Sequence, residues 1–241
     1  MKAIFFDLDN TLYDYDSVDV IATEALFKEF QNDKKMEFEE FNRLYKESKD
    51  EIKRELVGSA ASHNRILYIQ RLTEKVHKTA TPERILALYH AYWDTLIENM
   101  KLLDGVIELF KYLQDEGLKI IIVTNLTAYI QMRKIKTLGI SEYVDDVITS
   151  EEAGFDKPHP SNFLLALHQS NLLPADVVMV GDNLLADIEG AKAVEVKTVW
   201  FKFGKHGAEE PKNPYQQPDY TVSSHMELMA LIKSWREVVT A

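Results

Sequence analysis

Two hydrophobic patterns alternate along most of the chain, namely short apolar runs and longer stretches with a helical repeat. The short runs are rich in β-branched and aromatic residues and are bounded by polar residues or glycine, which is typical of buried strands. They lie at 3–6, 119–123, 144–148, 177–180 and 198–201. Strands and helices that alternate in this way favour a parallel sheet with helices on both faces.

The helical stretches lie between and after these runs. In the clearest one, apolar residues recur at positions 106, 109, 110 and 113, and Gly117 supplies a C-terminal stop. The same pattern predicts helices over 130–138, over 160–170 and over 228–235. The stretch 204–218 combines glycine, proline and polar residues, so we expect a surface loop there.

The segment from 16 to 99 breaks this alternation, because it contains no run typical of a strand. Apolar residues follow helical spacing around 26–30, 41–45 and 85–96, while the small residues of 58–62 predict a loop. Four helices are therefore expected in this segment. We predict an α/β protein in which residues 1–15 plus 100–241 form a doubly wound, Rossmann-like parallel-sheet core and residues 16–99 form an inserted, all-helical cap domain.

Composition narrows the classes of partner. The chain has 28 Lys and Arg against 39 Asp and Glu, a net charge of −11, and no cysteine. The acidic balance disfavours nucleic-acid polymers, and the lack of cysteine excludes disulfides and thiol chemistry. No apolar run approaches the ~20 residues of a membrane span. We expect a cytoplasmic monomer or homodimer with no nucleic-acid polymer and no membrane as partner.

Polar side chains follow four of the predicted strands. Ligands of an open parallel sheet bind beyond the carboxyl ends of its strands, so these residues are expected on one rim. Singly, each could be a turn former, a helix cap or a solvated side chain. Together, several carboxylates, a hydroxyl and a lysine favour a functional site. The candidates are Asp7, Asp9, Thr124, Asn125, Lys157, Asp182, Asn183 and Asp187.

Clustered carboxylates require a counter-cation. Two like charges ~4 Å apart repel by ~4 kcal/mol at an effective dielectric near 20, and Asp7, Asp9 and Asp182 would face this repulsion. Hard oxygen ligands favour Mg²⁺, which commonly binds carboxylates together with a substrate phosphate. No pair of histidines has zinc spacing, and no Walker loop or Gly-x-Gly-x-x-Gly fingerprint is present.

Four stretches resemble, in chain order, the four motifs of the haloacid dehalogenase superfamily. They are Asp7-Leu8-Asp9-Asn10-Thr11, Thr124-Asn125, Lys157-Pro158 and Gly181-Asp182 with Asp187. A helical insertion between the first two stretches resembles the subfamily that carries a cap at this place. The resemblance implies a phosphatase in which Asp7 is the nucleophile that forms an aspartyl-phosphate, and Asp9 is first the general acid and then the base.

The resemblance also implies roles for the other residues. Mg²⁺ would be held by the Asp7 side chain, the Asp9 backbone carbonyl and the Asp182 side chain. Thr124, Asn125 and Lys157 would bind the phosphate oxygens. Asn183 and Asp187 would orient the waters of the metal, or Lys157, from behind.

The predicted function is therefore hydrolysis of a small phosphomonoester, such as a sugar phosphate, a nucleoside monophosphate or phosphoglycolate. In the dehalogenases of this superfamily the residue two positions after the nucleophile is not Asp, so Asp9 favours the phosphatase over a haloacid dehalogenase. A phosphomutase and a non-catalytic binding protein remain open alternatives. Candidate contacts to the phosphorylated metabolite are Tyr13, Tyr15, His63, Asn64 and Arg65.

Overall fold

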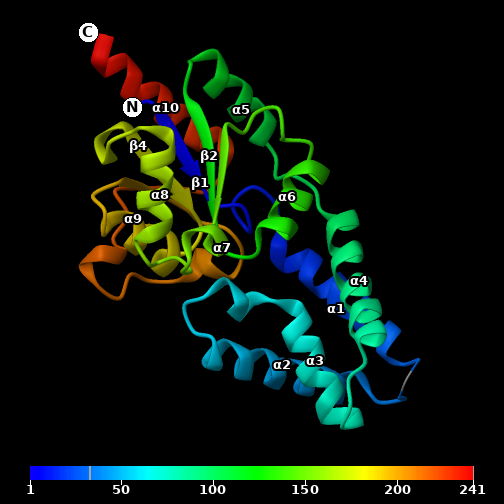
Figure 1. Ribbon diagram of the computed structural model, residues 1–241. Helices are drawn as coiled ribbons and strands as arrows, with labels where there is room; N and C mark the ends of the chain where they lie inside the picture. The colour runs from blue at the N-terminus through cyan, green and yellow to red at the C-terminus, as the bar shows by residue number, and fades with distance from the viewer. Residues whose placement is uncertain (33, 241) are drawn as a thin grey trace.

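The computed structural model describes residues 1–32 and 34–240, with side chains up to residue 236. Its centre is a six-stranded sheet in which every strand pair is parallel, with the order β3-β2-β1-β4-β5-β6 (Figure 1). The strands are β1 (Ala3–Phe6), β2 (Lys119–Thr124), β3 (Asp146–Thr149), β4 (Val177–Gly181), β5 (Lys197–Phe201) and β6 (Tyr220–Val222). The predicted parallel α/β sheet is thus confirmed.

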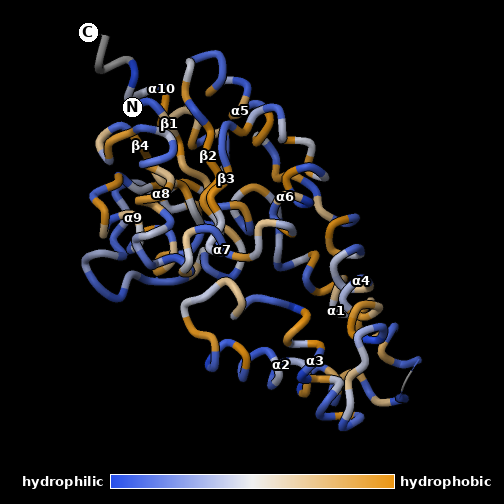
Figure 2. The backbone as a smooth tube through the Cα atoms, viewed as in Figure 1, coloured by the Kyte–Doolittle hydropathy of each residue, from blue (hydrophilic) through white to orange (hydrophobic). Residues whose placement is uncertain are grey.

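Side chains of the central strands alternate between two buried layers. Ile4 and Phe6 of β1 pack on one face with α5 (Val106–Asp115) and α10 (His225–Thr240), whereas Ala3 and Phe5 pack on the other with α8 (Ser161–Ser170). The strands are hydrophobic along most of their length because both faces are covered (Figure 2). The remaining helices beside the sheet are α6 (Ala128–Thr137), α7 (Ser150–Ala153) and α9 (Gly190–Lys192).

The strand order places a topological switch point at β1. The chain builds β2 and β3 on one side of β1, and β4, β5 and β6 on the other. The connection that leaves β1 and the one that leaves β4 therefore run to opposite sides, which opens a crevice at the carboxyl ends of these two strands. The polar residues that follow these strands are placed at this crevice by the fold alone.

Three sequence expectations need correction. The strand β6 was not predicted, because its three residues pair only with β5 at the sheet edge and two of them are exposed. The expected surface loop over 204–218 contains two short 3₁₀ helices, Gly204–Ala208 and Pro214–Gln216. The expected loop over 58–62 enters a third 3₁₀ helix, Ala60–His63.

Between Tyr15 and Asn99, all regular elements that the structure describes are helices. This segment contains α1 (Tyr15–Phe30), α2 (Phe38–Glu55), α3 (Arg65–His77) and α4 (Pro82–Asn99), besides the 3₁₀ helix 60–63. The four helices lie beyond the carboxyl ends of the strands, with α1 beside α4 and α2 beside α3 (Figure 1). The aromatic rings of Phe27, Phe30 and Phe41 join α1 to α2, with centroids 5.2–5.4 Å apart.

The helical insertion also touches the sheet layer through α6. Arg133 of α6 donates a 2.6 Å hydrogen bond to the carboxylate of Asp94 in α4. Within residues 1–32 and 34–240, no helix is both long and apolar enough to cross a bilayer.

Candidate active site

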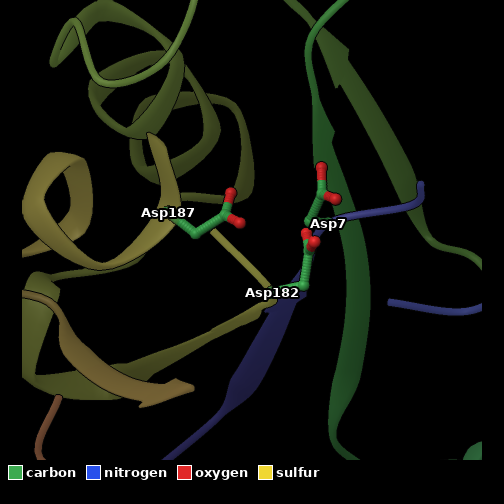
Figure 3. Close-up of side chains that lie close together, drawn as sticks. All are labelled: Asp7, Asp182 and Asp187. Carbon is green, nitrogen blue, oxygen red and sulfur yellow. The ribbon is translucent and has the colours of Figure 1, made fainter. Parts of the chain in front are cut away.

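Three carboxylates are buried together at the crevice. Asp7 follows β1, Asp182 follows β4, and Asp187 lies in the π-helical turn Leu184–Glu189. One oxygen of each lies within 4.8 Å of the others, and the three side chains point toward a common space (Figure 3). Their exposed fractions are 7%, 4% and 1%, so water screens their mutual repulsion poorly.

Lys157 supplies one positive charge to this cluster. Its Nζ donates to Oδ1 of Asp7 at 2.7 Å, to Oδ1 of Asp187 at 2.6 Å and to the carbonyl of Val123 at 2.7 Å. Burial alone would lower the pKa of Lys157, but the charges and hydrogen bonds of Asp187 and Asp7 outweigh burial and raise that pKa above its ordinary value. The lysine is therefore protonated at neutral pH.

One lysine does not neutralise three carboxylates. Burial, together with the charges of Asp187 and Asp9, raises the pKa of Asp7 to about 7 even though Lys157 opposes this shift. Burial and the charges of Asp7 and Asp187 raise the pKa of Asp182 well above its ordinary value. Oδ2 of Asp182 is buried without a hydrogen-bond partner among the described residues. The space between these carboxylates is rich in oxygen acceptors and lacks positive charge. It therefore fits a hard divalent cation with oxygen ligands.

The end of β2 fixes the loop that carries Lys157. The side chain of Asn125 accepts the Lys157 backbone N–H at 2.7 Å and donates to the Lys157 carbonyl at 3.3 Å. The hydroxyl of Thr124 accepts a 2.6 Å hydrogen bond from Nε2 of Gln131 in α6. Asn125 therefore aligns the lysine with the carboxylates, while Gln131 orients the Thr124 hydroxyl.

Asp9 lies beside this cluster, in contact with a lysine that sequence reasoning missed. Its carboxylate accepts a 2.7 Å hydrogen bond from the Tyr13 hydroxyl and two 2.8 Å hydrogen bonds from Nζ of Lys134. The Lys134 side chain is 0% exposed, against 28% for Asp9. The sequence feature that could have revealed Lys134 is its spacing, because it stands four residues after Ile130 and so lies on the buried face of α6.

Asn183 and Gly181 support Asp187. The backbone N–H of Asn183 donates to Oδ2 of Asp187 at 3.0 Å, and its side chain caps the turn by accepting from the amides of Leu185 and Ala186. A Cβ atom on Gly181 would lie 2.3 Å from Oδ2 of Asp187. Glycine at this position is thus a steric requirement of the carboxylate cluster.

A cavity of about 210 Å³ opens above the carboxylates. All eight residues predicted from the strand ends line it: Asp7, Asp9, Thr124, Asn125, Lys157, Asp182, Asn183 and Asp187. Side chains that sequence reasoning did not name as contacts also line it, among them Lys49, Lys53, Trp93, Lys205 and His206.

The five predicted substrate contacts, from the helical insertion and the segment before it, divide into two groups. Tyr15, His63 and Arg65 line the cavity. Asn64 instead caps α3 by accepting from the amide of Ile66 at 2.9 Å, and Tyr13 is fully buried against Asp9. Each of the two short stretches, 13–15 and 63–65, contributes residues to both groups. The sequence alone therefore could not tell which side chains reach the cavity.

Gly181→Ala is expected to destabilise the fold by about 3 kcal/mol, because the added methyl group displaces a buried carboxylate that binds Lys157. The midpoint of urea unfolding measures this loss, provided that the m-value stays constant. A midpoint equal to that of the wild type would show that Asp187 can move at no cost.

Asp182→Asn is expected to stabilise the metal-free protein at neutral pH by about 1–2 kcal/mol, because it removes one of three buried negative charges. The folded-state pKa of Asp7 is about 7 and the unfolded value is 3.8, so between these values the folded state holds protons that the unfolded state has lost. This contribution to stability falls as the pH rises through that window.

Thermal unfolding in a chelator between about pH 4 and 7 tests this expectation, since Asp182→Asn weakens the repulsion and flattens the slope. The exposed Asp115→Asn is the matched control and leaves the slope unchanged. A lower melting temperature of Asp182→Asn at neutral pH would contradict the electrostatic account.

Residues 1–195 match the family model of haloacid dehalogenase-like hydrolases. The chain is 42% identical over 200 residues to ribulose-1,5-bisphosphate 5-phosphatase of Halopiger xanaduensis, covering 83% of this chain and 84% of that protein. It is 30% identical over 235 residues to glyceraldehyde 3-phosphate phosphatase of Methanopyrus kandleri, covering 97% of each. The crystal structure of a HAD phosphatase from Thermococcus onnurineus has the same fold, with a TM-score of 0.73 at 24% identity over 96% of this chain and 98% of that one.

These matches confirm the superfamily and the fold class predicted from the sequence, and the two relatives named as phosphatases support the predicted hydrolase of phosphoric monoesters. The chain belongs to the haloacid dehalogenase-like hydrolases.

Proposed function

We propose that this protein is an Mg²⁺-dependent phosphatase that hydrolyses a small phosphorylated sugar through a phosphoryl group carried on Asp7. The observation that carries this proposal is the buried triad of Asp7, Asp182 and Asp187, which has a single lysine as counter-charge and lies at the base of a small cavity. A phosphate dianion could enter this site only if a further cation offsets the carboxylates.

Asp7 is the proposed nucleophile. Lys157 binds its Oδ1, which leaves Oδ2 to attack phosphorus. The new bond joins Oδ2 to phosphorus, and the bond from phosphorus to the sugar oxygen breaks. Water then attacks the aspartyl-phosphate and restores the carboxylate. Mg²⁺, held by the Asp7 and Asp182 side chains and the Asp9 carbonyl, would offset the negative charge of the phosphate.

Asp9 is the proposed acid and base. It would give a proton to the departing sugar oxygen and later accept one from the attacking water. Lys134 and Tyr13 hold its carboxylate at the wall of the cavity, within reach of groups bound there. Lys134 and Tyr13 are thus positioning residues for Asp9.

Thr124, Asn125 and Lys157 are the proposed phosphate ligands. The Thr124 oxygen accepts from Gln131 and its proton goes to the Asn125 carbonyl at 3.3 Å, so Thr124 would give up this long hydrogen bond to donate to a phosphate oxygen. The backbone amide of Asn125 would provide a second donor. Asn183 and Asp187 would not contact the phosphate themselves. Asp187 accepts a hydrogen bond from Nζ of Lys157, and the backbone amide of Asn183 donates to Asp187.

We further propose that residues 16–99 act as a cap domain on a core formed by residues 1–15 plus 100–241. The support is that Tyr15, Lys49, Lys53, Arg65 and Trp93, which come from the helical insertion or its border, line the same cavity as the carboxylates. A cavity of about 210 Å³ limits the substrate to a small molecule.

The relatives named for ribulose-1,5-bisphosphate and glyceraldehyde 3-phosphate favour a sugar phosphate over a nucleoside monophosphate or phosphoglycolate. A cytoplasmic location and a monomeric or homodimeric state remain predictions from the sequence.

Phosphate release from glyceraldehyde 3-phosphate, ribulose 1,5-bisphosphate and para-nitrophenyl phosphate tests the chemistry, with Mg²⁺ and with a chelator. We expect Asp7→Asn to lower kcat by about a thousandfold or more, because the nucleophile is lost. The chelator should abolish turnover, and the exposed Asp115→Asn should behave as wild type. Full activity of Asp7→Asn would refute the proposal.

Asp9→Asn separates the two chemical steps. Para-nitrophenol leaves without an acid, so this variant should release about one equivalent in a burst and then stall with a phosphoryl group on Asp7. Mass spectrometry of the acid-quenched protein detects that group. Steady turnover without a burst would remove Asp9 from the second step, and transfer between sugar positions without phosphate release would indicate a phosphomutase.

A further inference from the structure

The side of the cavity that the helical insertion forms is positively charged. Lys49 and Lys53 of α2 and Arg65 at the start of α3 line the cavity there, and Lys205 joins them from the 3₁₀ helix 204–208. This concentration of positive charge is local, because the whole chain carries a net charge of −11.

Lys49 and Lys53 lack an ion-pair partner in the part of the chain that the structure describes. They stand one turn apart on the same face of α2 and are half-buried. Among the described residues, neither side chain makes a hydrogen bond or an ion pair.

Some other basic residues of α2 and α3 are paired, as Arg43 is with Glu47 at 2.7 Å and Lys75 is with Glu51 at 2.6 Å. Lys46 and Arg54 of α2 have no ion pair among the described residues either, but both are exposed to solvent. Lys49 and Lys53 thus differ from Lys46 because they are half-buried and line the cavity while lacking a described partner.

Arg65 adds a fixed charge to this region. Its guanidinium is buried and donates to the hydroxyls of Tyr15 and Tyr92 and to the carbonyl of His63, and it lies 5.4 Å from the centre of the Trp93 ring. None of these direct contacts is a carboxylate. The carboxylate nearest to this network is Asp19, which accepts from both tyrosine hydroxyls.

This arrangement disfavours the charged forms of Lys49 and Lys53. Burial, and then the charge of Arg65, lowers the pKa of Lys49 to about 8, although Asp19 opposes this shift. Burial, Arg65 and Lys205 also lower the pKa of Lys53, with Asp50 and Asp156 acting in the opposite direction. A bound anion would relieve this repulsion and hold both lysines in the charged form.

The transferred phosphate does not need these lysines. At the carboxylate end of the cavity, Lys157, Thr124 and Asn125 already serve that group, and Lys157 is anchored there by Asp7 and Asp187. Lys49 and Lys53 come from a different part of the chain and share none of these hydrogen bonds.

We propose that Lys49 and Lys53 bind a second anionic group of the substrate, so that the enzyme selects small sugar phosphates that carry another phosphate or a carboxylate remote from the phosphate it removes. The proposal rests on the phosphatase function above and deepens it. Arg65 adds to the positive potential at this end without leaving its tyrosine partners.

Two matched substrate pairs test the selection. Ribulose 1,5-bisphosphate and ribulose 5-phosphate differ in a phosphate, and 3-phosphoglycerate and glyceraldehyde 3-phosphate differ in a carboxylate. In at least one pair we expect the substrate with two anionic groups to have kcat/KM about tenfold higher in the wild type, and the pair with the larger ratio identifies the second group.

The variant Lys49→Gln/Lys53→Gln should lose about a hundredfold in kcat/KM on the preferred substrate, mainly through KM. Its turnover of para-nitrophenyl phosphate should stay within about threefold of wild type, which also shows that the variant folds. The control Lys46→Gln lies on the exposed face of α2 and should change neither activity.

Equal losses of the double variant on substrates with one and with two anionic groups, or a wild-type preference for the substrate with one anionic group in both pairs, would overturn the proposal. Calorimetric binding of ribulose 1,5-bisphosphate to Asp7→Asn keeps the result separate from catalysis. Binding that weakens when Lys49 and Lys53 are replaced supports the anion site even if no phosphate is released, whereas binding that does not weaken contradicts it.

Discussion

The contact on which the site depends is the buried ammonium group of Lys157 between Asp7 and Asp187. Three hydrogen bonds of 2.6–2.7 Å tie the loop that carries Lys157 to Asp7 after β1, to the Val123 carbonyl in β2 and to Asp187 in the turn after β4. Burial raises the pKa of Asp7, and the charge of Lys157 opposes this shift. The Asn125 clamp and the absence of a side chain at Gly181 both serve the same contact, because each fixes one of its partners.

The buried part of the fold could be predicted from the sequence. Strands such as β1 and β4 are covered on both faces, so they appear as continuous apolar runs. The strand β6 has no such apolar run, because it lies at the sheet edge with two of its three residues exposed. Asp7 and Asp182 were predictable for a related reason: parallel strands end at one edge, so the residues that follow them converge.

Other parts of the site depend on packing between distant segments, which local pattern does not reveal. Lys134 and Gln131 are polar residues inside a helix and look like solvated positions, although both are fully buried. Lys49 and Lys53 lie in a helix with many charged residues, so the sequence does not distinguish them from solvated surface lysines. Their significance follows only from the side of α2 that faces the cavity.

The helix α6 connects three separate parts of the molecule. Its neighbouring residues Gln131, Arg133 and Lys134 bind Thr124, Asp94 and Asp9, respectively. One of these partners is a phosphate-binding candidate, another belongs to the helical insertion, and the last is the acid–base candidate. The position of α4 and the orientations of Thr124 and Asp9 are therefore linked through a single helix.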